Sequence, residues 1–201
     1  ITRPEQIMPA LRRTMQVLTD PAECGPVTLS LCQDVQAEAY DYPESFFAEK
    51  VWVPRRIMPD ADEFATAAAA LKLAKKPVII AGNPARYSVD PAQLQELAES
   101  TGIPVFTVEQ ARGLLDDEHP LCFGYADGAL NPTARHFREA DVVLLLGKRL
   151  DHRYRYGGIF SDSAKIIQAD PSAAEIGRNR GVAVGIEADL GAGGEQITAA
   201  C

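Results

Sequence analysis

Hydrophobic and polar residues follow two different patterns along the 201-residue chain, and the change comes near residue 60. Over residues 4–18, apolar residues recur every three or four positions, which predicts an amphipathic helix. The β-branched and apolar run 27–31 predicts one short strand. Residues 37–59 contain three prolines and no regular period, which is typical of a linker. Because one helix and one strand cannot enclose a core, we expect residues 1–36 to be the C-terminal part of a neighbouring domain.

From residue 60 onward, short apolar runs alternate with segments that have a helical pattern. Continuous apolar runs are typical of parallel strands that are buried on both faces of a sheet. We therefore predict an α/β fold over residues 60–201, with a Rossmann-like, doubly wound parallel sheet of about six strands. The expected strands are 78–82, 103–107, 121–124, 142–147, 164–169 and 182–184. The expected helices are 60–76, 90–102, 131–140 and 190–200, and Ser172 to Glu175 reads as a capping box.

The composition narrows the class of function. An apolar fraction of 46% is enough for a buried core and excludes a disordered chain. With 28 acidic and 20 basic residues the net charge is -8, which disfavours binding to nucleic acid or to anionic membranes. The sequence shows no apolar run long enough to cross a membrane and no signal-peptide core. The four cysteines lack metal-binding spacing, so we expect free thiols and a cytoplasmic protein.

A ligand crevice is expected beyond the carboxyl ends of the first and fourth strands of the domain, where the strand order of such a sheet reverses. Gly82 and Gly147 end these strands and would let a ligand approach the backbone. Arg149 could bind a phosphate, and Asp170 could accept a hydrogen bond from a ribose hydroxyl or an adenine amine. The same residues also suit ordinary turns, so both interpretations stay open.

Other segments offer weaker signals. Neither GxGxxG nor a P-loop is present, and the glycines of 191–194 are interpreted as a flexible tail. The basic segment 148–156, with its two tyrosines, could bind a polyanion, or could be a solvated loop that pairs with acidic neighbours or another subunit. His119 has carboxylates nearby but no second histidine at ligand spacing, which favours a structural turn. No catalytic residue is predicted.

Five motifs follow one another between about residue 60 and residue 189: KKPVIIAG, GIPVFT, DDEHPLCFG, EADVVLLLGKRLDHR and AKIIQADPSAAEIGRNR. In this order they resemble the central domain of thiamine-diphosphate-dependent enzymes of the acetolactate synthase type. Ahead of them, residues 20–36 resemble the end of the pyrimidine-binding domain of that family. The longer run CGPVTLSLCQDVQAEAYDYPESFF is most similar to the trihydroxycyclohexanedione hydrolases within it.

This resemblance implies a longer parent chain, a homodimer or homotetramer, that acts on carbon–carbon bonds of an α-keto acid or a cyclic dione. In the family, a glutamate of the pyrimidine domain activates thiamine diphosphate, and a GDG motif with later asparagines holds Mg²⁺ on the diphosphate domain. Neither is found here, and Asp127-Gly128 with Asn131 has the wrong spacing. We therefore expect this chain alone to bind no thiamine diphosphate.

Some central domains of the family bind ADP or FAD. Consecutive glycines in FAD-binding members are replaced here by Asn83 and Pro84 after Gly82, which would crowd a diphosphate, so ADP or no ligand is expected rather than FAD. An ADP- or FAD-binding regulatory module and a NAD-dependent oxidoreductase are the alternative functions. The candidate cofactor-binding residues are Gly82, Asn83, Gly147, Arg149, Asp170 and Asp189.

Overall fold

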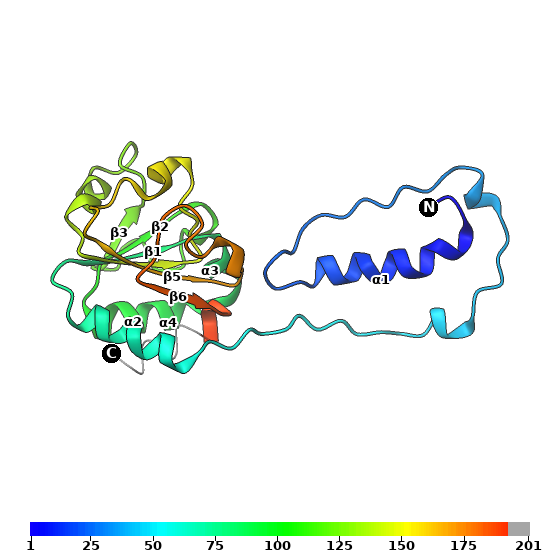
Figure 1. Ribbon diagram of the computed structural model, residues 1–201, viewed down its shortest axis with the longest axis horizontal. Coiled ribbons are helices and arrows are strands. Elements are labelled where there is room, and N and C mark those ends of the chain that lie inside the picture. The colour runs from blue at the N-terminus through cyan, green and yellow to red at the C-terminus, as the bar shows by residue number, and fades with distance from the viewer. Residues whose placement is uncertain (193–201) are drawn as a thin grey trace. The chain divides into compact units, whose positions relative to one another are not determined.

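A computed structural model describes residues 1–192 of the chain, which divides into two compact units, 1–55 and 56 onward. The second unit contains a six-stranded parallel sheet of order β3-β2-β1-β4-β5-β6, which confirms the predicted fold class (Figure 1). The strands are β1 (Pro77–Ala81), β2 (Val105–Thr107), β3 (Cys122–Tyr125), β4 (Val142–Leu146), β5 (Lys165–Asp170) and β6 (Val184–Glu187).

The strand order reverses between β1 and β4, which pair from Pro77↔Val142 to Ala81↔Leu146. All five residues of β4 are buried, as its continuous apolar run predicts. The predicted last strand, 182–184, is wrong in its bounds because β6 begins where that run ends. Within β6, Val184 and Ile186 are buried and Gly185 and Glu187 are not, so the strand buries only every second residue and has no continuous apolar run.

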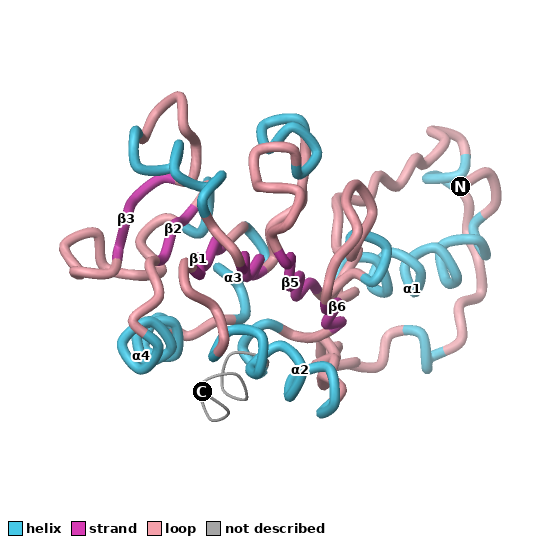
Figure 2. The backbone as a smooth tube through the Cα atoms, turned by 60° about the vertical axis from the view of Figure 1, so that its left-hand side comes forward, coloured by secondary structure: helices cyan, strands magenta, loops and turns pink. Residues whose placement is uncertain are grey.

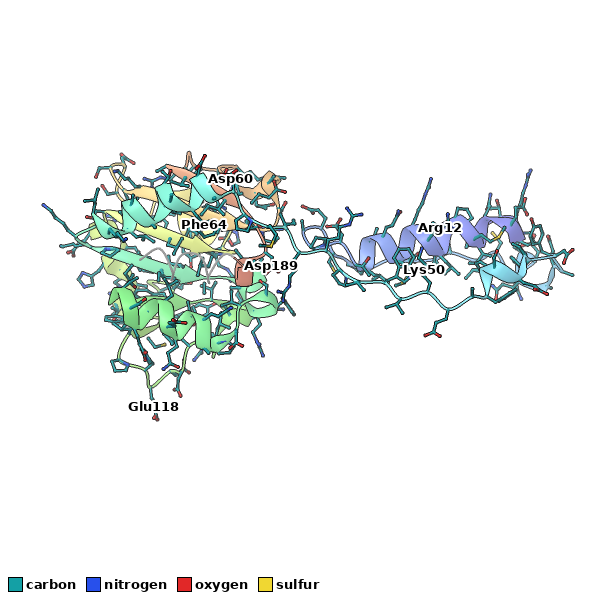
Figure 3. All side chains as sticks on the ribbon, turned by 90° about the horizontal axis from the view of Figure 1, so that it is seen from below. Arg12, Lys50, Asp60, Phe64, Glu118 and Asp189 are labelled. Atoms are coloured by element: carbon teal, nitrogen blue, oxygen red, sulfur yellow. The ribbon has the colours of Figure 1, made fainter. Side chains whose placement is uncertain are left out.

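One face of the sheet is covered by α2 (Ala61–Lys72) and α4 (Pro91–Thr101), as Figure 2 shows. Each helix begins after an aspartate that caps it: the carboxylate of Asp60 accepts the N–H groups of Asp62 and Glu63, and Asp90 forms a capping box with Gln93. Figure 3 labels Asp60, where α2 begins, and Phe64, whose side chain is buried in the core.

Helix α2 ends four residues earlier than predicted, at Lys72 rather than Lys76. The reason is tertiary: the N–H groups of Lys75 and Lys76 donate to the carboxylate of Asp141, at 2.7 and 2.9 Å, rather than to helix carbonyls. The short helix α3 (Asn83–Ser88), which directly follows Gly82, is not among the predicted helices.

The other face is covered by 3₁₀ segments, chiefly η5 (Pro132–Glu139) and η6 (His152–Gly157). The predicted α-helix 131–140 is therefore wrong in type. Its buried residues are Ala134, Phe137 and Ala140, three positions apart, and this period belongs to the 3₁₀ helix. The predicted capping box is also wrong: η7 (Ala173–Glu175) follows Ser172, whose side chain makes no capping bond.

The sheet separates two hydrophobic clusters, one under each covering layer. The first joins α2 and α4 to Ile79, Leu144 and Ile167, and the second joins η5 and η6 to Ile80, Leu145 and Ile166. Neighbouring residues of each strand thus point to opposite faces, as strand geometry requires. One further short 3₁₀ turn, η4 (Glu109–Ala111), follows β2.

The first unit holds η1 (Pro4–Gln6), α1 (Ile7–Leu18), η2 (Val35–Ala37) and η3 (Glu44–Phe46). The predicted helix is confirmed, but the predicted strand 27–31 is wrong. The amino group of Ile1 donates to the Ser30 carbonyl, yet no strand within residues 1–192 pairs with this run along its length. Within residues 1–55, all of which are described, Val35 alone is buried.

Two further expectations concern the end of the chain and the membrane. Residues 190–192 are helical, and the rest of the predicted helix 190–200, with Gly193 and Gly194, lies outside the described residues. In the described part of the chain, every helix is too short or too polar to span a bilayer.

Candidate functional site

The predicted crevice lies where β1 and β4 end, and the chain's own backbone comes close together there. The N–H of Gly82 donates to the Leu146 carbonyl at 2.8 Å. A Cβ on Gly82 would lie 2.2 Å from the carbonyl oxygen of Gly147, which itself has a φ of +61°. Both glycines are therefore required by the packing of two chain segments, a role that differs from close approach to a ligand.

Asn83 belongs to a network that links the ends of three strands. Its amide donates to Glu109 Oε2 at 2.9 Å and accepts the Gln110 N–H at 3.1 Å. Glu109, which has a φ of +50°, also pairs with Arg153 in η6. The network therefore connects the segments after β1, β2 and β4. Sequence reasoning missed Glu109, although its position two residues after β2 places it at the same edge of the sheet.

The three charged candidates each have a partner within the fold. Arg149 Nε lies 3.5 Å from a carboxylate oxygen of Glu175. Asp170 is buried, and its Oδ1 accepts the Ser172 N–H at 3.0 Å. Asp189 accepts the Ala192 N–H at 3.0 Å. The Asp170 and Asp189 contacts are those of local turns, and the Arg149 contact is an ion pair between distant segments. Nucleotide binding by the six candidate residues stays a prediction.

An ion pair with a buried lysine and a partly exposed aspartate lies beside this crevice. Lys148 Nζ, on a side chain that is only 6% exposed, lies 2.9 Å from Asp151 Oδ2 and 4.5 Å from the centroid of the Tyr154 ring. Burial raises the pKa of Asp151, but the hydrogen bond and charge of Lys148, together with the hydrogen bond from the Arg153 N–H, outweigh burial, so the pKa is lowered from its usual value. Burial raises the pKa of Tyr154, whose hydroxyl donates to the Ala126 carbonyl at 2.8 Å.

A cavity of about 530 Å³ opens between the segment after β3, η5 and η6. Its wall includes four arginines, and we call it the arginine pocket. Asp127 is the one acidic residue of its lining, and Phe137 and Ile159 contribute apolar surface. Only Arg153 and Arg155 belong to the basic segment 148–156 that the sequence singles out. The four arginines are Arg135, Arg138, Arg153 and Arg155.

The described residues do not fit a Mg²⁺–diphosphate site. No group of three His, Cys, Asp or Glu side chains among them is placed to hold a metal ion. Asn131 donates to the carbonyls of Phe123 and Tyr125, and the Asp127 carboxylate accepts the Ala129 N–H, so both side chains serve local turns. His119 likewise accepts the Leu121 N–H, as expected of a structural turn.

The comparisons with known proteins identify the family. Residues 64–197 match the sequence model described as "Thiamine pyrophosphate enzyme, central domain". The chain belongs to this family. The resemblance read from its motifs is confirmed, and the family supports neither a nucleotide-binding regulatory module nor a NAD-dependent oxidoreductase.

Curated relatives carry the name 3D-(3,5/4)-trihydroxycyclohexane-1,2-dione hydrolase. One from Geobacillus thermodenitrificans is 36% identical over 202 residues, covering 100% of this chain and 31% of its own length. One from Clostridium perfringens is 37% identical over 172 residues, covering 85% of this chain and 26% of its own length. The chain therefore spans about a third or less of the length of these relatives.

A solved structure from Mycobacterium smegmatis, described as a thiamin diphosphate-dependent enzyme, has a TM-score of 0.78 and 24% identity. The match covers 100% of this chain and 38% of that one. At this level of identity it supports the fold alone.

Proposed function

We propose that this chain is the central part of a longer thiamine-diphosphate-dependent enzyme that hydrolyses a cyclic dione, as the trihydroxycyclohexanedione hydrolases do. The observation that carries the proposal is the extent of the match to the Geobacillus protein. It covers the whole chain, including residues 1–63, which lie before the matched central domain. The more general family match would not by itself favour this substrate over an α-keto acid.

In this proposal the second unit is a scaffold, and the cofactor is held elsewhere. Thiamine diphosphate would supply a carbanion that attacks a substrate carbonyl, and Mg²⁺ would bind its diphosphate. The side chains at the carboxyl edge of the sheet bond to one another instead: Asn83 to Glu109, Glu109 to Arg153, and Arg149 to Glu175. Their proposed role is to hold the loops at this edge in one arrangement.

We propose further that residues 1–36 are the end of a pyrimidine-binding domain and that 37–59 link it to the central domain. In support, α1 has no buried residue, and its apolar side chains Val17 and Leu18 are 40% and 45% exposed. A segment that buries so little of its apolar surface gains little stability by itself. The parent would be a homodimer or homotetramer, as in the family.

The test uses the full-length protein encoded by the gene. Incubated with thiamine diphosphate, Mg²⁺ and 3D-(3,5/4)-trihydroxycyclohexane-1,2-dione, it should open the ring, with product detected by mass spectrometry. Pyruvate condensation to acetolactate is the matched control reaction and should be much slower. Turnover of pyruvate in preference to the cyclic dione would contradict the proposed substrate.

A second experiment tests the role of this chain. Calorimetric titration of the 201-residue protein with thiamine diphosphate and Mg²⁺ should give no binding heat, because the residues that hold the cofactor belong to other parts of the parent. Saturable binding with a dissociation constant of about 1–10 μM would contradict the scaffold role. Light scattering of the full-length protein would show whether it is a dimer or tetramer.

A further inference from the structure

The arginine pocket concentrates positive charge on a protein that is acidic as a whole. Its lining carries four arginines against one aspartate, whereas the entire chain has a net charge of -8. The arginines come from two segments that are far apart in the sequence, Arg135 and Arg138 from η5 and Arg153 and Arg155 from η6. The fold therefore creates a cationic cavity that the charge balance of the sequence does not predict.

Two of these arginines have no side-chain partner among the described residues 1–192. Arg153 pairs with Glu109, and Arg135 Nε donates to the Gly128 carbonyl at 2.9 Å. In the part of the chain that the structure describes, the guanidinium groups of Arg138 and Arg155 make neither a hydrogen bond nor an ion pair with protein. The carboxylate of Asp127 is engaged in its own turn, where it accepts the Ala129 N–H at 2.8 Å.

The backbone that carries Arg155 is held in an unfavourable conformation. Arg155 and Tyr156 have φ angles of 47° and 55°, in the left-handed region that side chains with a Cβ rarely adopt. The preceding residue, Tyr154, is buried and bonded to the Ala126 carbonyl, which anchors the segment to the wall of the pocket. Such backbone strain is found where the surrounding structure fixes a functional side chain.

We propose that the arginine pocket binds a small-molecule dianion, with a phosphate or dicarboxylate group held by Arg138 and Arg155. A guanidinium donates two parallel hydrogen bonds to either group, and two guanidinium groups match its two charges. The cavity of about 530 Å³ has the size of a small-molecule site, and Phe137 and Ile159 provide an apolar surface for the carbon skeleton. The inference is independent of the proposed function, because the ring named for the relatives has no ionised group.

The test measures anion binding by the 201-residue chain in low salt at pH 7.5, with inorganic phosphate in one titration and malonate in another. Arg138→Ala and Arg155→Ala should each weaken binding of the preferred anion about tenfold, and the double variant further. Arg112→Ala is the matched control: Arg112 is exposed, pairs with Asp117 at 3.2 Å and lies outside the pocket lining, so affinity should be unchanged.

The two titrations distinguish the two kinds of anion, since the anion that binds with the lower dissociation constant shows whether the pocket prefers a phosphate or a pair of carboxylates. Equal affinities for the wild type and both pocket variants would overturn the proposal, as would no binding of either anion up to about 10 mM. Arg138 and Arg155 lie on different segments, so if one variant unfolds the other still provides the test. Neither cofactor nor cyclic dione is used, and failure here would leave the proposed function untouched.

Discussion

The carbonyl oxygen of Gly147 occupies the space that a side chain at position 82 would need, because a Cβ on Gly82 would lie 2.2 Å from it. The contact joins the ends of β1 and β4, where the order of the sheet reverses. Two backbone segments therefore pack against each other where the sequence predicts a ligand crevice.

Replacement of Gly82 by alanine should therefore destabilise the fold by about 3 kcal/mol, because the backbone of β4 cannot move without disturbing the sheet. The measurement is the free energy of unfolding from urea titrations followed by circular dichroism. Gly181→Ala is the matched control: nothing lies within 4 Å of a Cβ there and its φ is not in the left-handed region, so the change should be within about 0.5 kcal/mol. Equal destabilisation by the two variants would contradict the packing argument.

Asp151→Asn should destabilise the protein by about 2–3 kcal/mol, because it leaves the ammonium group of Lys148 buried without its carboxylate. Urea unfolding again measures the effect. The exposed pair of Arg112 and Asp117 provides the comparison, and Asp117→Asn should cost no more than about 0.5 kcal/mol since water replaces the lost contact. If Lys148→Met restores stability to the Asp151→Asn variant, the buried charge is the cause.

Asp141 should make stability depend on pH in the acid range. Desolvation raises the pKa of Asp141, but hydrogen bonds from the N–H groups of Lys75 and Lys76 lower it below its usual 3.8 overall. The stabilisation is therefore present above pH 3.8 and is lost as the pH falls through the lower, folded-state pKa.

The Asp141→Asn variant should lose about 1 kcal/mol at pH 7, because an amide accepts these hydrogen bonds more weakly than a carboxylate. The difference from the wild type should shrink as the pH falls below 3.8. Thermal unfolding at a series of pH values checks both points, and a difference that stays constant down to pH 2 would contradict this assignment.

Phe137→Ala should cost about 3–4 kcal/mol. The ring of Phe137 is 4% exposed and meets the Phe106 ring edge-on, with the centroids 4.8 Å apart. Thr133→Ala, on the exposed side of η5, should change stability by less than about 0.5 kcal/mol. The two variants test the 3₁₀ period because an α-helix would turn a different set of residues toward the sheet. Hydrogen exchange across η5 should be faster in Phe137→Ala and unchanged in Thr133→Ala. Equal effects of the two substitutions would contradict the 3₁₀ assignment.

Much of the fold could be read from local pattern. The runs that form β1 and β4 are apolar throughout, and Asp60 and Asp90 start helices through bonds to residues two or three positions away. The last strand and η5 were harder to predict because their apolar residues are sparse. In η5, the three-residue spacing of Ala134, Phe137 and Ala140 is the pattern that indicates a 3₁₀ helix rather than an α-helix.

The sequence by itself determined the parallel sheet and the order of its six strands along the chain, the helices that begin after Asp60 and Asp90 and, through its motifs, the family. Only the tertiary structure decided what the side chains at the carboxyl edge of the sheet do. Glu109 is 26 residues from Asn83 and 44 from Arg153, yet it contacts both. Such contacts, and the presence of Arg138 and Arg155 in one pocket, arise because parallel strands and their crossovers bring segments that are distant in the sequence to the same edge of the sheet. A local sequence pattern carries no information about which distant segments meet.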